Sequence, residues 1–246
     1  MSGSTTPDVV GVLQDAQRLG FLGPRPIDEV VAHARGFVRA LVEHGPVETV
    51  LDLGAGGGTP GLVIALDLPS VALTLLDRRA KRTDFLERVV RRLGWQDRVS
   101  VVCRDVTSFE PVELFDAVVA RGFGPPEFTL TVAARLVRPG RPIVISEPPG
   151  DDRWDDELLD RLELRRVDVR DVRPSASWTP HLDGLVAVFI RRVAGHPQRA
   201  TRGPESGVGD VSRETWRNAC LSVLNPAEYA GPQSGERQHH HPPSCL

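Results

Sequence analysis

The sequence predicts an α/β fold in which a mostly parallel sheet carries helices on both faces. From residue 48 onward, short apolar segments rich in β-branched residues alternate with amphipathic segments of helical spacing. A glycine-dense turn, residues 54–58, follows the first apolar segment, as in many strand-to-helix connections of such sheets. The chain has 246 residues and is 40% hydrophobic, enough for one large domain with an appendage.

Two helices are expected before the first strand. Apolar residues recur at helical spacing over 9–19 and again over 27–41, and the segment between them is rich in Gly and Pro. We expect residues 1–47 to form an N-terminal helical cap on the sheet.

Seven strands and four further helices are expected over residues 48–195. The last two strands should pair as an antiparallel hairpin that closes the sheet, and ligands should bind at the carboxyl ends of the parallel strands. Cys103 is expected to be a core residue of the third strand. The predicted strands are 48–53, 71–77, 99–103, 115–120, 142–147, 163–170 and 184–192, and the helices are 59–67, 80–93, 125–137 and 152–161.

The segment 196–246 differs in composition from the rest of the chain. It is rich in Gly, Pro, Ser, Arg and Gln, and we expect a flexible tail with one short helix over 211–224. Three consecutive histidines, 239–241, can bind metal adventitiously, but the three cysteines form no CxxC pair and no metal site is expected.

Composition also limits the setting of the protein. The sequence has no apolar stretch of about 18 residues and no signal-peptide pattern at its start, so we expect a cytoplasmic monomer without membrane contact. A net charge of −3 argues weakly against tight nucleic-acid binding, although a local basic patch can still provide it.

The stretch VLDLGAGGGTPG, residues 50–61, is the strongest indication of a ligand site. Its glycines allow close approach of a ligand, and the following helix start presents backbone amides. NAD enzymes use a similar turn. Asp52 would repel a pyrophosphate, whereas S-adenosylmethionine is cationic and carries no phosphate, so we expect S-adenosylmethionine as cofactor. The predicted contacts are Asp52, Gly54, Ala55, Gly56, Gly58 and Pro60.

The next two strands should supply the rest of the cofactor site. Asp77 ends the second strand about 20 residues after the glycines, where a carboxylate can hold a ribose diol. Asp105 follows the third strand and can accept a hydrogen bond from an adenine amino group, although an ordinary turn explains it nearly as well. The adjacent Arg78 and Val106 are assigned to the same site.

A basic run crowds the start of the helix predicted over 80–93. Arg79, Lys81 and Arg82 lie where the helix dipole disfavours positive charge, which suggests contact with substrate phosphate. The alternative is ion pairing with nearby acids such as Asp84.

Together, these motifs resemble those of the RsmG (GidB) family of 16S ribosomal RNA guanine-N7 methyltransferases, over roughly residues 8–195. The resemblance implies a class I methyltransferase fold with a Rossmann-like seven-stranded sheet, S-adenosylmethionine as cofactor, the small ribosomal subunit or its RNA as partner, and a catalytic, substrate-side role for Arg121. The motifs that carry it are Gly23-Pro24-Arg25, His33-Ala34-Arg35, the loop 52–61, Asp77 with Lys81-Arg82 and Phe85-Leu86, Ala120-Arg121, and Arg138-Pro139-Gly140.

Methyl transfer to guanine N7 needs no general base, because that nitrogen has a lone pair and no proton, so the protein mainly positions the reactants. Amino-group methyltransferases would be expected to carry an Asn/Asp-Pro-Pro-aromatic box after the fourth strand. Here that position reads Ala120-Arg121-Gly122-Phe123.

One position departs from the family pattern. Family members usually carry Lys-Gly at the end of the fifth strand, where this chain has Ser146-Glu147-Pro148. We expect Glu147 at the opening of the substrate site, opposite Arg121 and able to form an ion pair with it. Its negative charge should repel phosphate there. Two alternatives remain: a related enzyme that methylates a small or cationic molecule, and a non-catalytic module that binds the cofactor or the ribosome.

Overall fold

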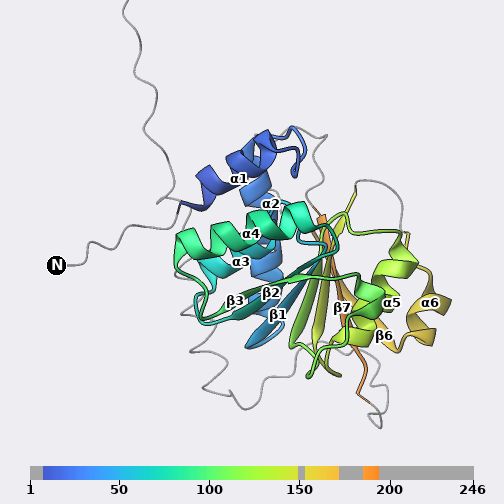
Figure 1. Ribbon diagram of the computed structural model, residues 1–246. Helices are drawn as coiled ribbons and strands as arrows, with labels where there is room; N and C mark the ends of the chain where they lie inside the picture. The colour runs from blue at the N-terminus through green and yellow to red at the C-terminus, as the bar shows by residue number, and fades with distance from the viewer. Residues whose placement is uncertain (1–7, 149–152, 172–184, 194–246) are drawn as a thin grey trace, which may run out of the picture.

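The computed structural model describes residues 8–148, 153–171 and 185–193. A seven-stranded sheet has the order β3-β2-β1-β4-β5-β7-β6 (Figure 1). The first five strands run parallel, and β7 pairs antiparallel with both β5 and β6. The strands are β1 Thr49–Leu53, β2 Ala72–Asp77, β3 Val99–Cys103, β4 Ala117–Ala120, β5 Pro142–Glu147, β6 Leu164–Asp171 and β7 Leu185–Arg191. The predicted fold class is therefore confirmed.

Helices cover both faces of this sheet (Figure 1). The N-terminal pair is α1 Val9–Arg18 and α2 Ile27–Glu43, and the helices between the strands are α3 Gly61–Asp67, α4 Ala80–Leu93, α5 Pro126–Leu136 and α6 Asp156–Arg161. A short 3₁₀ helix, η1, covers Val106–Ser108. The chain order reverses direction across the sheet between β1 and β4, the position where ligands bind in open α/β sheets.

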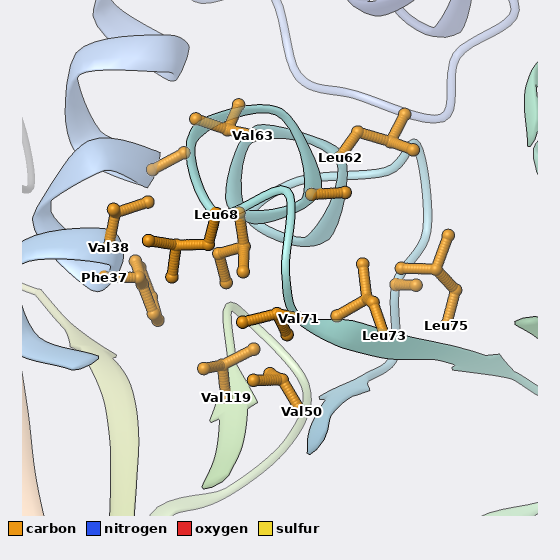
Figure 2. Close-up of a cluster of buried hydrophobic side chains, with 14 of the residues drawn as sticks. Phe37, Val38, Val50, Leu62, Val63, Leu68, Val71, Leu73, Leu75 and Val119 are labelled. Carbon is orange, nitrogen blue, oxygen red and sulfur yellow. The ribbon is translucent and has the colours of Figure 1, made fainter. Parts of the chain in front are cut away.

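Alternation along the strands divides the apolar interior into two layers. Val50 packs with α2, α3 and α4 on one face, whereas Leu51 and Leu53 pack with α5 and α6 on the other. Figure 2 shows the first layer, where Phe37 and Val38 of α2 lie close to α3 and the strand side chains. Asp52 shares the parity of Val50, so its carboxylate is buried on this face of the sheet.

The N-terminal helices bring the segment 19–26 to the glycine turn. Two hydrogen bonds from the Gln17 side chain, to the carbonyl oxygens of Gly23 (2.6 Å) and Arg25 (2.8 Å), fold this segment back on α1. Leu22 then packs so closely on Gly57 that a Cβ there would lie 2.6 Å from Leu22 Cγ. The predicted helical cap thus forms one wall of the site.

Several predicted boundaries differ from the structure. The helix predicted from 59 begins at Gly61, because Thr59 and Pro60 complete the turn and the Gly61 amide bonds to the Asp52 side chain. The helix predicted from 152 begins at Asp156, where Asp155 caps it by accepting from the Glu157 amide (3.0 Å). The prediction that Cys103 is buried was wrong, because it ends the edge strand β3 and is exposed.

The predicted tail over 196–246, with its short helix and histidine run, lies outside the described residues. Among the helices that are described, none has the length and apolarity to cross a membrane. Within the same residues no cluster of three or more His, Cys, Asp or Glu side chains is arranged to hold a metal ion.

Candidate cofactor and substrate site

The glycine turn is fixed to the neighbouring strand. The amides of Gly54 and Ala55 both donate to the carbonyl oxygen of Leu76, at 2.8 and 3.0 Å. Gly54 has a φ of +71°, and a Cβ at this position would lie 2.6 Å from Cδ2 of Phe123. A side chain here would therefore meet both backbone strain and a packed aromatic ring, which explains the glycine.

Asp77 links this turn to the start of α4. Its Oδ2 accepts from the Gly56 amide (3.0 Å), and its Oδ1 accepts from the Arg79 amide (2.9 Å). Arg82 lies 3.5 Å from Oδ2, and the Asp77 side chain is only 5% exposed. Each carboxylate oxygen thus fixes one backbone segment at the edge of a cavity.

Two adjoining cavities open at the carboxyl ends of the parallel strands. The smaller has a volume of about 390 Å³ and the larger about 550 Å³, each within the range of small-molecule sites. Both are lined by Gly54, Arg82 and the segment 122–124. The ring of Phe123, packed on Gly54, therefore lies where the two cavities meet.

The smaller cavity combines acidic and basic side chains from the ends of β2 and β3. Besides Gly54 and Arg82, it contains five predicted residues: Asp77, Arg78, Arg79, Asp105 and Val106. The amide and hydroxyl of Thr107 donate to Oδ1 of Asp105 at 3.0 and 2.8 Å and hold the pKa of that carboxyl below its usual range. Arg78 lies 3.7 Å from the other oxygen of Asp105, and both side chains are exposed.

The larger cavity lies between the glycine turn, the N-terminal segment and the end of β5. Four arginines line it, Arg25, Arg82, Arg121 and Arg153, together with one carboxylate, Glu147, among its described residues. Arg121 donates from Nη1 to Oγ1 of Thr59 at 3.4 Å, so it lies beside the glycine turn, and its catalytic role stays a prediction. This charge balance favours an anionic ligand.

Glu147 ends β5 and lines the larger cavity, as the sequence indicated. Arg153 donates from Nε to its Oε2 at 3.1 Å, and the Trp154 indole donates to Oε1. The negative charge of Glu147 is therefore balanced by Arg153, a partner that the sequence analysis missed. The expected pairing of Glu147 with Arg121 stays a prediction.

Asp52 lies beneath the site. It is 1% exposed, and its Oδ2 accepts from the Gly61 amide at 2.9 Å, where α3 begins. Burial raises the pKa of Asp52 to about 7, against the opposing effects of that hydrogen bond and of the positive charge of Arg121. Asp52 is absent from the lining of both described cavities, so its contact with a cofactor stays a prediction.

Three other predicted residues also lie outside the two linings. Gly58 has a φ of +98°, and a Cβ there would lie 2.4 Å from Cδ1 of Leu62, so it makes room for packing against α3. Pro60 is buried at the start of α3, and Lys81 is exposed on α4. Gly58 and Pro60 thus pack in the interior, between the turn and α3.

Sequence reasoning missed several residues that form the walls. Phe123 stacks on Phe128 with ring centroids 5.8 Å apart, and Arg104 lines the smaller cavity. Arg153 and Trp154 line the larger cavity. Arg104 directly follows β3, which was a usable signal, but no local pattern indicates where Phe123 or Arg153 packs.

Two methyltransferases of known structure have a similar fold. N-methyltransferase NodS from Bradyrhizobium japonicum WM9, in complex with S-adenosyl-L-homocysteine, aligns with a TM-score of 0.50 and 18% identity, over 73% of this chain and 98% of that one. The 1,6-didemethyltoxoflavin-N1-methyltransferase of Burkholderia thailandensis, also with S-adenosylhomocysteine, aligns with a TM-score of 0.53 and 20% identity, over 78% and 93%. At these identities the likeness shows the fold alone.

The sequence relatives, unlike the structural neighbours, share one name. A protein named ribosomal RNA small subunit methyltransferase G from Laribacter hongkongensis is 42% identical over 76 residues, 31% of this chain and 36% of that protein. Its namesake from Thermotoga neapolitana is 32% identical over 126 residues, 51% of this chain and 55% of that protein. The chain thus spans about half or less of the length of these relatives.

The family model described as GidB, rRNA small subunit methyltransferase G, matches residues 13–147, which is more than half of the chain. The matched region runs from α1 to the end of β5 and includes the glycine turn, Asp77, Arg121 and Glu147. The chain belongs to the GidB family, the rRNA small subunit methyltransferases G.

Proposed function

We propose that this protein is an S-adenosylmethionine-dependent methyltransferase that methylates guanine N7 in small-subunit ribosomal RNA. The observation that carries the proposal is the pair of adjoining cavities on either side of the glycine turn. Each is lined by four arginines, but the smaller cavity also presents the carboxylates Asp77 and Asp105, whereas the described lining of the larger one has the carboxylate Glu147 alone. A nucleoside cofactor suits the first, and a phosphate-bearing substrate suits the second.

The residues of the smaller cavity fit the nucleoside part of the cofactor. The Asp77 carboxylate already accepts two backbone amides, and an oxygen has two lone pairs, so acceptor capacity remains for a ribose hydroxyl. Asp105 can accept from an amino group, and Val106 offers an apolar surface for a base. The close packing on Gly54 and Gly58 leaves no space for other side chains in the turn.

The charges of the larger cavity support RNA over a cationic substrate. Glu147, the one carboxylate among the described residues of its lining, is paired with Arg153, and Arg121 lies beside the glycine turn. A cationic molecule would meet an excess of guanidinium groups, whereas a phosphate would be attracted to them.

The proposed methyl transfer to guanine N7 requires no general base. Bound S-adenosylmethionine would supply the methyl group. Guanine presents its N7 and O6 acceptors along one edge, so an arginine donor can bind O6 while the N7 lone pair remains available. We assign this positioning role to Arg121, which Thr59 holds at the turn between the two cavities.

A methyl-transfer assay tests this proposal. The protein is incubated with tritiated S-adenosylmethionine and, in separate reactions, with small ribosomal subunits lacking the modification, with their free RNA, and with a metabolite extract. We expect label in RNA and its loss with Asp77→Ala. Label confined to the metabolites would establish the small-molecule alternative, and cofactor binding without transfer to any substrate would establish the non-catalytic one.

A further inference from the structure

We infer that Arg153 is a substrate-positioning residue, which holds an RNA phosphate in the larger cavity and is itself oriented by Glu147 and Trp154. The inference rests on the proposed function, because it concerns the same substrate. It assigns Glu147 to orientation of the arginine instead of direct contact with substrate.

Three contacts fix the Arg153 guanidinium. Its Nε donates to Oε2 of Glu147 at 3.1 Å, and its Nη2 donates to the carbonyl oxygen of Ser146 at 2.9 Å. Its Cζ lies 4.8 Å from the centre of the Trp154 ring, within the range of a cation–π contact. Together these contacts restrict the orientation of the guanidinium.

The supports of Arg153 are themselves anchored. Trp154 is 7% exposed and packs edge-on against Phe189 of β7, with ring centroids 4.8 Å apart. Its indole also donates to Glu147, which ends the interior strand β5. The orientation of Arg153 is thus set by the sheet and its core, not by the arginine's own flexible stem.

Exposure separates the two charged groups. The Glu147 side chain is 9% exposed and the Arg153 side chain 29%, and both line the larger cavity. An arginine carries five N–H donors, and the two recorded hydrogen bonds use two of them. The accessible group is therefore a cation with donors available, in the geometry that binds phosphate with two parallel hydrogen bonds.

Fixing the guanidinium before the substrate arrives has an energetic consequence. Immobilising a long side chain on binding opposes association, and a side chain that is already held avoids most of that penalty. Neutralising Glu147 should therefore weaken RNA binding even though it makes the cavity more positive. If only the net charge of the cavity mattered, neutralising Glu147 would instead strengthen RNA binding. The effect of this change on RNA affinity therefore separates the two explanations.

The experiment uses the full chain with S-adenosylhomocysteine, small ribosomal subunits and a salt series. Arg153→Ala should weaken binding about tenfold and reduce the slope of log affinity against log salt by about 1, as expected for one lost phosphate contact. The matched control is Arg161→Ala, which removes the same charge from α6, where Arg161 is 58% exposed, pairs with Glu127 and is not part of the larger cavity's lining. It should leave affinity and slope unchanged.

Two further variants separate orientation from charge. Glu147→Gln should keep the salt slope but weaken binding and raise the KM for RNA more than it lowers kcat. Arg153→Lys should keep the slope and restore only part of the affinity, since an ammonium lacks the planar fork. The affinity for S-adenosylhomocysteine should stay at the wild-type value, and Arg153→Gln replaces the alanine variant if that variant unfolds.

The inference is overturned if Arg153→Ala and Arg153→Gln keep the wild-type slope, or if Glu147→Gln binds RNA more tightly. A failure of the proposed function looks different. In that case the wild-type protein itself would transfer no methyl group to ribosomal RNA and show no salt-dependent binding to it.

Discussion

Asp52→Asn should remove a pH-dependent loss of stability that the wild-type protein carries. Asp52 is 1% exposed in an apolar layer, and burial raises its pKa from 3.8 to about 7 although the Gly61 hydrogen bond and Arg121 oppose the shift. The folded state thus favours the protonated form. The stability that comes from protonated Asp52 is fully present below about pH 4 and is lost as the pH rises toward 7. Asparagine mimics the neutral acid and does not titrate.

The size of the effect follows from the shift. One pKa unit corresponds to about 1.4 kcal/mol, so the advantage of the variant over wild type should grow by about 2 kcal/mol between pH 5 and pH 7. For a chain of this size that is a widening of the melting-temperature difference by about 4–8 °C. The measurement is thermal unfolding of the wild-type protein and the variant from pH 5 to pH 7. Taking the difference between their melting temperatures removes the effect of all groups that titrate equally in both proteins. A difference that stays constant from pH 5 to pH 8 would refute the reasoning.

Three further variants test other parts of the structure. Gly54→Ala should lower cofactor affinity more than tenfold in calorimetry, because φ is +71° and Cδ2 of Phe123 would lie 2.6 Å from the new Cβ; unchanged affinity would mean that the turn is not the binding site. Asp77→Asn should also weaken S-adenosylhomocysteine binding about tenfold, because an amide has one oxygen for two backbone donors; equal affinities would contradict the role of the carboxylate. Arg138→Ala should lower the melting temperature more at pH 7 than at pH 3. Burial alone would raise the pKa of Asp116, but hydrogen bonds to its carboxylate, including one from Arg138 (2.8 Å), outweigh burial and lower that pKa. The stabilisation by the Arg138–Asp116 pair is therefore lost as the pH falls through the lowered pKa of Asp116. A melting-temperature loss of the same size at pH 3 and pH 7 would contradict this role of the pair.

Local patterns predicted the sheet and the cofactor side of the site. Strand periodicity, the glycine turn and the acid at the end of the next strand are short-range signals, and parallel strands bring their carboxyl ends to one edge. Asp77 and Asp105 were predicted on this basis and line the smaller cavity, whereas Arg121, which lines the larger cavity, was implied by the family resemblance.

The remaining features depend on packing between distant segments. The position of Phe123 on Gly54 follows from how β4 leads into α5. Arg153 balances the negative charge of Glu147 at the end of β5, and no spacing rule indicates this pairing. Asp52 is predicted to contact the cofactor because it precedes the glycines, and this contact stays a prediction. What the local pattern did not indicate is that its side chain is buried and accepts a hydrogen bond from the Gly61 amide.

We propose above that this chain methylates guanine N7 in small-subunit ribosomal RNA. The most direct test is nucleoside analysis by mass spectrometry of ribosomal RNA from small subunits treated with the protein and S-adenosylmethionine. We expect 7-methylguanosine at one site per RNA with the wild-type protein and a loss of most of it with Arg121→Ala. A methyl group on an exocyclic amine or a ribose, or unmodified RNA beside a methylated small molecule, would contradict the claim.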